Sequence, residues 1–174
     1  MTAYNKHELR RLPHSELVKI FGELPPPSLE EMDGEFLATG LDQSGRLQNL
    51  LGSLFVNWSG LWLGKAFHPE SSEEGKGYNF FLRGKEILRT FPMGTYVAPS
   101  GVVSGPSYHV DYSRFRTGFI TGSGRDEIRK VSDGLYLGVG RLTFSRAAGR
   151  RLHPFLLEGP TAPFHCLESL GITS

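Results

Sequence analysis

The spacing of hydrophobic and polar positions changes partway along the chain. After Ser15, the residues Leu17, Ile20, Phe21 and Leu24 recur at intervals of three and four. This spacing predicts an amphipathic helix. Three consecutive prolines follow at 25–27 and end the helix, because proline cannot continue its hydrogen-bond ladder.

Two more signals before residue 57 favour helical structure. Ser28 followed by Glu31 has the form of a capping box and predicts a short helical turn. An apolar stripe along residues 45–55 predicts a second amphipathic helix. We therefore expect residues 1–56 to form a helical N-terminal segment.

From residue 57 onward, short apolar or alternating runs are separated by glycine, proline and serine. This pattern is typical of an all-β barrel or sandwich. Asp133-Gly134 lies between two such runs and predicts a hairpin turn. The expected strands lie at 61–68, 77–83, 85–93, 94–99, 107–115, 127–134, 135–144 and 153–159.

Length and composition narrow the class of protein. The 174 residues indicate a single domain, with a barrel at 57–160 and a C-terminal tail at 161–174. A formal net charge of +1 does not indicate a basic surface that would bind nucleic acid. The first residues lack the apolar stretch of a secretory signal, and no run of eighteen apolar residues predicts a membrane span. We expect a cytoplasmic protein.

Two expected strands combine aromatic and small residues on one face. Alternation places Trp62, Gly64, Ala66 and His68 together on the first strand. Near the end of the barrel it groups Tyr136, Gly138, Gly140, Leu142 and Phe144. Glycines of this kind either allow a barrel to curve or leave room for a ligand, and both interpretations stay open here.

Several of these stretches resemble the GXWXG-type proteins, a lipocalin-like family of uncharacterised function. The segment 24–42, "LPPPSLEEMDGEFLATGLD", would hold the family signature at 34–38, with Phe36 in place of the tryptophan. Trp62, Gly64, Lys65 and Phe67 match the second motif, and 126–144 resembles the closing hairpin. The resemblance, that of a divergent member, implies an antiparallel calycin-like barrel with an interior pocket. It implies no established reaction.

The most polar stretch is 107–116, "SYHVDYSRFR". Alternation places His109 and Asp111 on one strand face and Tyr108, Val110 and Tyr112 on the other. A carboxylate that orients an imidazole suits general acid–base catalysis. The pair could equally line a pocket or lie on a solvated surface. If the protein is an enzyme, Asp111 with His109 or Tyr112 is the candidate catalytic set.

Two basic residues have competing interpretations. Lys65 could cover the indole face of Trp62 in a cation–π contact that closes the barrel end, or it could take part in Schiff-base or anion chemistry. Arg129 lies in the charged run 124–131, which is typical of an exposed strand edge. Alternatively, Arg129 points inward to a ligand carboxylate or a buried acid.

No cofactor or metal is expected. The six histidines lack metal-ligand spacing, and the single cysteine, Cys166, excludes an internal disulfide. His165 is the candidate for a proximal haem ligand, which would need to face the cavity.

These observations favour binding of an apolar or aromatic small molecule in the barrel cavity. The candidate ligand-binding residues are Trp62, Phe80, Tyr96, Arg129, Tyr136 and Phe144. An isomerase or cyclase that acts on a hydrophobic metabolite in the same cavity, with the Asp/His pair as acid and base, is the alternative. A purely structural or interaction module is a third possibility. The sequence leaves open whether the protein forms a homodimer.

Overall fold

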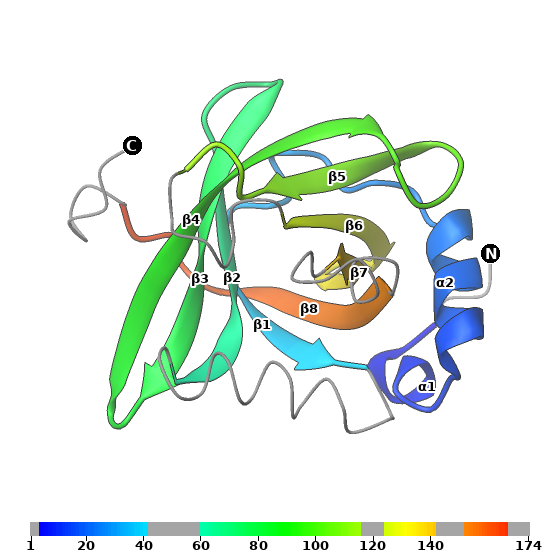
Figure 1. Ribbon diagram of the computed structural model, residues 1–174, viewed down its shortest axis with the longest axis horizontal. Coiled ribbons are helices and arrows are strands. Elements are labelled where there is room, and N and C mark those ends of the chain that lie inside the picture. Colours follow the sequence, from blue (N-terminus) through cyan, green and yellow to red (C-terminus); the bar gives the residue numbers. More distant parts are fainter. Residues whose placement is uncertain (1–3, 42–59, 116–123, 142–151, 167–174) are drawn as a thin grey trace.

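The computed structural model describes residues 4–41, 60–115, 124–141 and 152–166. In these residues eight strands form a closed antiparallel barrel, in which each strand pairs with the next and the last pairs with the first (Figure 1). The predicted fold class, a mainly β barrel preceded by helices, is therefore confirmed.

The two helices are α1 (Lys6–Leu9) and α2 (His14–Glu23). The strands are β1 (Gly34–Gly40), β2 (Leu61–Pro69), β3 (Glu74–Arg83), β4 (Glu86–Pro99), β5 (Pro106–Asp111), β6 (Arg125–Ser132), β7 (Leu135–Arg141) and β8 (Leu152–Ala162).

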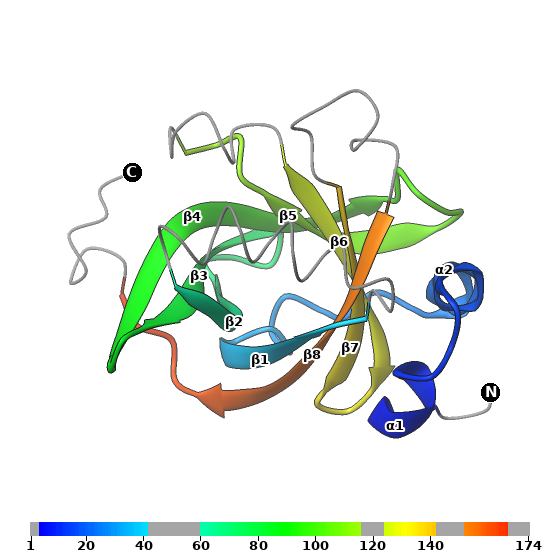
Figure 2. The same ribbon diagram turned by 60° about the horizontal axis from the view of Figure 1, so that its bottom comes forward.

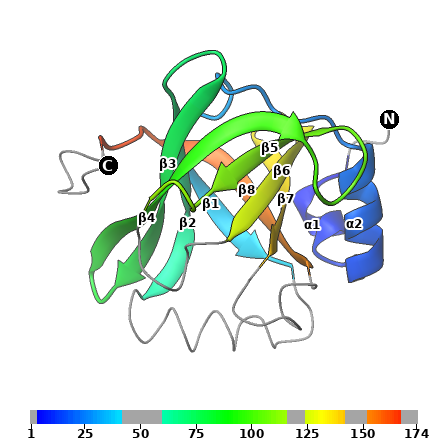
Figure 3. The same cartoon turned by 45° about the horizontal axis from the view of Figure 1, so that its top comes forward.

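Helix α2 forms where its apolar spacing predicts and packs on the outside of the barrel. Its buried face meets apolar side chains of β7 and β8, and α1 lies on the same side of the molecule (Figures 1 and 3). This outer cluster contains Leu17, Ile20, Phe21, Leu24, Leu137, Val139 and Leu156. No helix in the described parts of the chain is both long and apolar enough to cross a membrane.

The predicted capping box is present. The backbone N–H of Ser28 donates to the Glu31 carboxylate, and the Glu31 N–H donates to the Ser28 hydroxyl. The segment forms a turn rather than a helix, and its Leu29 and Met32 join the hydrophobic cluster of the barrel interior. The helix expected at 45–55 lies outside the described residues.

Strand β1 lies inside the segment that we expected to be helical. Residues 34–40 begin and end with glycine, which has one of the lowest helix propensities. Their side chains instead point alternately to the two faces of a strand: Phe36 is buried in the barrel interior, and Leu37 is exposed. Figure 2 shows β1 in the barrel wall between β2 and β8.

The later strands form close to where the sequence pattern predicts them, except that two expected strands are one continuous strand. The runs expected at 85–93 and 94–99 form the single strand β4. Pro92 does not break this strand because it lies at a register shift opposite β3, where a missing N–H costs no ladder bond. The turn between β6 and β7 contains Asp133-Gly134 as predicted, with Gly134 at a φ of 72°.

A bulge in β2 corrects the predicted faces of that strand. The register between β2 and β3 shifts between Trp62 and Gly64. Trp62 therefore lies on the interior side with Lys65, whereas Ala66 packs with Phe80 in a separate cluster outside the barrel. Strict alternation fails here because a bulge adds one residue to the count.

The spaces beside the strand glycines are filled by the protein itself. A Cβ at Gly138 would lie 2.2 Å from the Phe155 ring, and one at Gly140 would lie 2.8 Å from the Asp126 carboxylate. At Gly64 the backbone carbonyl of β1 would be 1.9 Å away. These glycines thus make room for neighbouring side chains and strands, rather than for a ligand in direct contact with them.

Replacing Gly138 by alanine tests this close packing. Because the new methyl group would overlap the Phe155 ring, we expect Gly138→Ala to lower the free energy of unfolding by about 1–3 kcal/mol. Gly40→Ala, where nothing lies within 4 Å, is the control. Urea denaturation measures both, and adding Phe155→Leu should recover part of the loss. A Gly138→Ala protein as stable as the control would contradict the packing.

Candidate functional site

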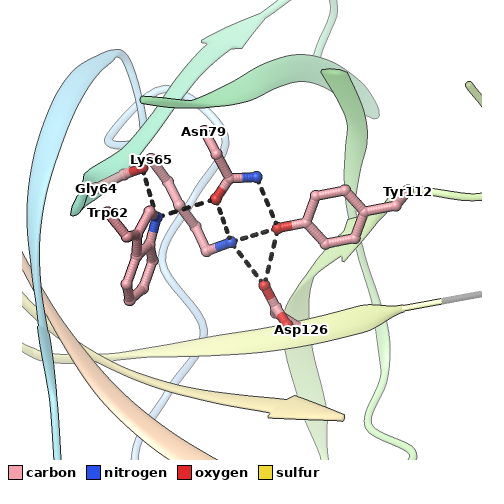
Figure 4. Close-up of polar contacts among 6 residues, drawn as sticks. All are labelled: Trp62, Gly64, Lys65, Asn79, Tyr112 and Asp126. Carbon is pink, nitrogen blue, oxygen red and sulfur yellow. Dashed lines mark hydrogen bonds and ion pairs between the residues drawn. The ribbon is translucent and has the colours of Figure 1, made fainter. Parts of the chain in front are cut away.

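A lysine ammonium group lies inside the barrel. Lys65 extends inward from β2 and is 3% exposed. It meets Asn79 from β3, Tyr112 just after β5 and Asp126 near the start of β6, while Trp62 contributes its indole N–H to the same network (Figure 4). We call these five residues the Lys65 cluster.

All three ammonium protons of Lys65 have acceptors. The Nζ atom lies 3.0 Å from Asn79 Oδ1 and 2.7 Å from Asp126 Oδ2, and it also donates to the Tyr112 hydroxyl. The ring centroids of Trp62, Tyr112 and Phe155 lie 5.1–5.6 Å from Nζ. The predicted cation–π contact with Trp62 is therefore present, but the lysine is a buried ion-pair partner as well.

The donors and acceptors of the cluster fix its proton positions. Asn79 Oδ1 must face the lysine and the Trp62 indole, because both of these groups can only donate. The amide Nδ2 then donates to Tyr112 over 3.1 Å. Since Tyr112 accepts from Lys65 and from Asn79, its own proton goes to Asp126 Oδ2, 3.1 Å away.

The cluster keeps its lysine charged and its tyrosine neutral. Burial alone would lower the pKa of Lys65, but the Asp126 carboxylate and Tyr112 raise it above the usual value. Burial, reinforced by the Asp126 charge, raises the pKa of Tyr112 to about 12. At neutral pH the interior thus holds an ammonium–carboxylate pair and a phenol that donates to the carboxylate.

The Lys65 cluster lies toward one end of the barrel. Antiparallel order brings the end of β5 and the starts of β2 and β6 to the same end, where Tyr112, Trp62 and Asp126 lie. Lys65 and Asn79 join them from the middle of β2 and β3. The Asp126 side chain is 15% exposed, whereas that of Lys65 is 4% exposed. Asp126 is therefore the charged member of the cluster that is more open to solvent.

The structure divides the predicted ligand-binding residues between the two faces of the barrel. Trp62 and Tyr136 belong to the interior cluster. Phe80 packs with Ala66 and Tyr78 on the outer face. Tyr96 stacks on His109 at 5.2 Å between ring centroids, also outside, and Phe144 lies outside the described residues.

Arg129 holds helix α2 to the barrel. Its guanidinium group donates to the carbonyls of Phe21, Gly22 and Leu24 at the end of that helix, and to Ser104 and Ser107. Strand β6 is paired on both sides, so the expected strand edge does not exist. The geometry gives Arg129 a role at a helix C-terminus, where unpaired carbonyls attract a cation.

The predicted catalytic residues do not meet. Tyr108, Val110 and Tyr112 face the interior, so the predicted alternation of this strand is confirmed. His109 and Asp111 consequently lie on the outer face. His109 Nε2 contacts the carbonyls of residues 98 and 99, and Asp111 accepts hydrogen bonds from Ser113. Tyr112 joins the Lys65 cluster instead.

The C-terminal candidates also lie outside the barrel. The backbone N–H of His165 donates to the Tyr78 hydroxyl, and Phe164 stacks on His68 beside it. Cys166 is exposed. The described residues contain no group of three or more His, Cys, Asp or Glu side chains that could hold a metal ion.

Asn79 and Asp126 are not among the site residues predicted from the sequence. Asp126 was grouped with a charged run, but it alternates with the buried Ile128 and pairs with Gly140. An acid on the same strand face as a core residue, opposite a glycine, is a usable signal for an inward carboxylate. Asn79 alternates with the buried Phe81 in the same way, but the bulge in β2 hides that its partner Lys65 shares a face with Trp62.

Comparisons with known proteins support the fold alone. No family model and no curated protein matches the chain. A solved structure, of a protein from Thermomonospora curvata, is similar with a TM-score of 0.57 and 13% sequence identity. The match covers 84% of this chain and 87% of that one.

Removing one partner of the buried ion pair should destabilise the barrel more than removing both. Lys65→Met leaves Asp126 without its counter-ion, and we expect a loss of roughly 2–4 kcal/mol in the free energy of unfolding. The double variant Lys65→Met/Asp126→Leu should cost less than Lys65→Met alone, and therefore less than the sum of the single variants, as measured by urea denaturation.

The exposed pair between Lys6 and Glu158 is the control for this cycle, with both side chains 33% exposed. Lys6→Met should change stability by less than about 1 kcal/mol. Additive effects of the Lys65 and Asp126 substitutions would contradict the direct coupling.

The raised pKa of Tyr112 predicts a dependence of stability on alkaline pH. The folded protein holds this proton more tightly than the unfolded chain, whose tyrosine pKa is about 10. Its contribution is thus complete below pH 10 and is lost as the pH rises toward 12. Urea denaturation at pH 9, 10 and 11 gives the free energy of unfolding at each pH. This free energy should fall less steeply with rising pH for Tyr112→Phe than for the wild type. Equal slopes would contradict the assignment.

Proposed function

We propose that this protein binds an apolar or aromatic small molecule inside the barrel, at the end that holds the Lys65 cluster. The observation that carries this proposal is the charged pair of Lys65 and Asp126 among aromatic rings. A buried ion pair adds little stability compared with apolar side chains of similar volume. Ligand sites, by contrast, combine apolar walls with a few placed polar groups.

Aromatic side chains supply the walls around the polar group. Trp62 meets Phe155 edge to face at 5.8 Å between ring centroids, and Phe36 meets Tyr136 in the same way at 5.7 Å. These rings face the interior from β1, β2, β7 and β8. An aromatic guest would find both ring edges and ring faces there, the two arrangements that aromatic pairs favour.

The family resemblance is consistent with this proposal. The two motifs that carry it are neighbours in the barrel, since Phe36 pairs with Lys65 and Gly34 pairs with Phe67 across β1 and β2. We propose that the chain is a divergent relative of the GXWXG-type proteins with a calycin-like barrel. In this chain the two motifs thus build one wall of the barrel and its buried cation.

An isomerase or cyclase that acts on a hydrophobic metabolite is the second candidate. It is favoured by the hydrogen bond from the Tyr112 hydroxyl to the Asp126 carboxylate inside the barrel. A carboxylate beside a neutral phenol can take and return a proton. The pair predicted from the sequence, Asp111 with His109, lies on the outer face. Acid–base chemistry in the interior would therefore use Asp126.

Native mass spectrometry of freshly purified protein tests the binding proposal. We expect a discrete extra mass that is absent under denaturing conditions and corresponds to an apolar or aromatic compound. Phe155→Ala removes an interior ring and should reduce its retention at least severalfold. Phe80→Ala removes a ring of similar burial on the outer face and should leave retention unchanged.

The same measurement separates the candidates. A compound that is recovered unchanged after incubation supports a binding protein, and recovery as an isomer of the added compound supports the enzyme. Equal loss of the extra mass in the two phenylalanine variants would place the ligand elsewhere. A chain that retains nothing, and binds no aromatic compound added to it, would overturn the proposal.

A further inference from the structure

We infer that the ligand carries a neutral hydrogen-bond donor, an O–H or N–H group, that binds the Oδ1 atom of Asp126. This inference rests on the proposed function and specifies the chemical class of the ligand. Three features of the Lys65 cluster support it. They are the donor and acceptor atoms that have no partner within the cluster, where these atoms lie, and the net charge of the cluster.

Most members of the cluster already use all of their side-chain hydrogen-bond donors and acceptors. Lys65 uses its three protons on Asn79, Tyr112 and Asp126. The Tyr112 hydroxyl accepts two hydrogen bonds and donates one, which is all that a phenol offers. The Trp62 indole has a single proton, and it is shared between Gly64 O and Asn79 Oδ1. A ligand could bond to these groups only by displacing an existing partner.

Asp126 keeps an acceptor. In the described parts of the chain, the side-chain contacts that bind its carboxylate, from Lys65 and Tyr112, both end on Oδ2. Oδ1 lies over Gly140, where a Cβ would approach it to 2.8 Å. A carboxylate oxygen can accept two hydrogen bonds, so Oδ1 is available to a donor. The remaining donor is one N–H of Asn79, which is only 6% exposed.

The charges of the cluster exclude one common class of ligand. The ammonium of Lys65 and the carboxylate of Asp126 cancel, so the site has no net positive charge to hold an anion. A ligand carboxylate would approach the more exposed and negatively charged member of the pair. A neutral hydroxyl or N–H donor instead forms a charge-assisted hydrogen bond and brings no second charge into the barrel.

Three naphthalene derivatives test this inference on the full-length protein. 2-Naphthol has a donor, 2-methoxynaphthalene has the same ring without a donor, and 2-naphthoate is an anion at neutral pH. Isothermal titration calorimetry should show that 2-naphthol binds roughly tenfold or more tightly than 2-methoxynaphthalene, since a hydrogen bond to a charged group is worth that much. 2-Naphthoate should bind most weakly.

Two variants connect the preference to Asp126. Asp126→Asn removes the negative charge and should reduce the preference for 2-naphthol to roughly twofold or less. Gly140→Ala leaves every charge in place but presses a methyl group against Oδ1, and it should also reduce the preference. If Asp126→Asn fails to fold, the preference measured for Gly140→Ala still tests the inference. Glu127→Gln, the neighbouring acid on the outer face, is the matched control and should keep the preference.

The outcomes distinguish this inference from the proposed function. If 2-naphthol and 2-methoxynaphthalene bind equally, or if 2-naphthoate binds most tightly, the barrel binds aromatic rings but the donor inference is wrong. A preference that survives in both Asp126→Asn and Gly140→Ala would also overturn it. If none of the three compounds binds, the proposed function fails together with the inference.

Discussion

The barrel interior is organised around one buried charge, the ammonium group of Lys65. A lysine that is 3% exposed must find partners for its charge and for its three protons. Asp126 balances the charge, Asn79 and Tyr112 accept the remaining protons, and aromatic rings surround the ammonium. Because each partner comes from a different part of the sheet, this arrangement requires the closed barrel.

The glycines of β7 contribute to the same arrangement. Gly140 lets the Asp126 carboxylate lie against the neighbouring strand, and Gly138 gives space to the ring of Phe155, one of the three rings near the ammonium. Small residues thus position the polar cluster and its aromatic surroundings. The hydrogen-bonding capacity that remains, on Asp126, is what gives the interior a specific chemistry rather than a general affinity for apolar molecules.

The sequence predicted the barrel, helix α2 and the β6–β7 turn, because alternation, helical spacing and turn residues are local signals. It grouped the residues of the two faces of β5 correctly, but it expected His109 and Asp111 to supply the acid–base pair of the cavity, whereas they lie on the outer face. The cluster itself was missed for two physical reasons. A one-residue bulge in β2 reverses the face of Lys65 relative to Trp62, and the partners of Lys65 come from strands distant in the sequence. Neither effect leaves a local pattern.

A crystal structure of the protein with bound 2-naphthol would test the central claim most directly. We predict that the ring lies inside the barrel against the aromatic residues near Lys65, with its hydroxyl oxygen within hydrogen-bond distance of Asp126 Oδ1 and the contacts of Lys65 unchanged. A ring bound on the outer face near His109, or a hydroxyl that displaces Lys65 from Asp126, would contradict it.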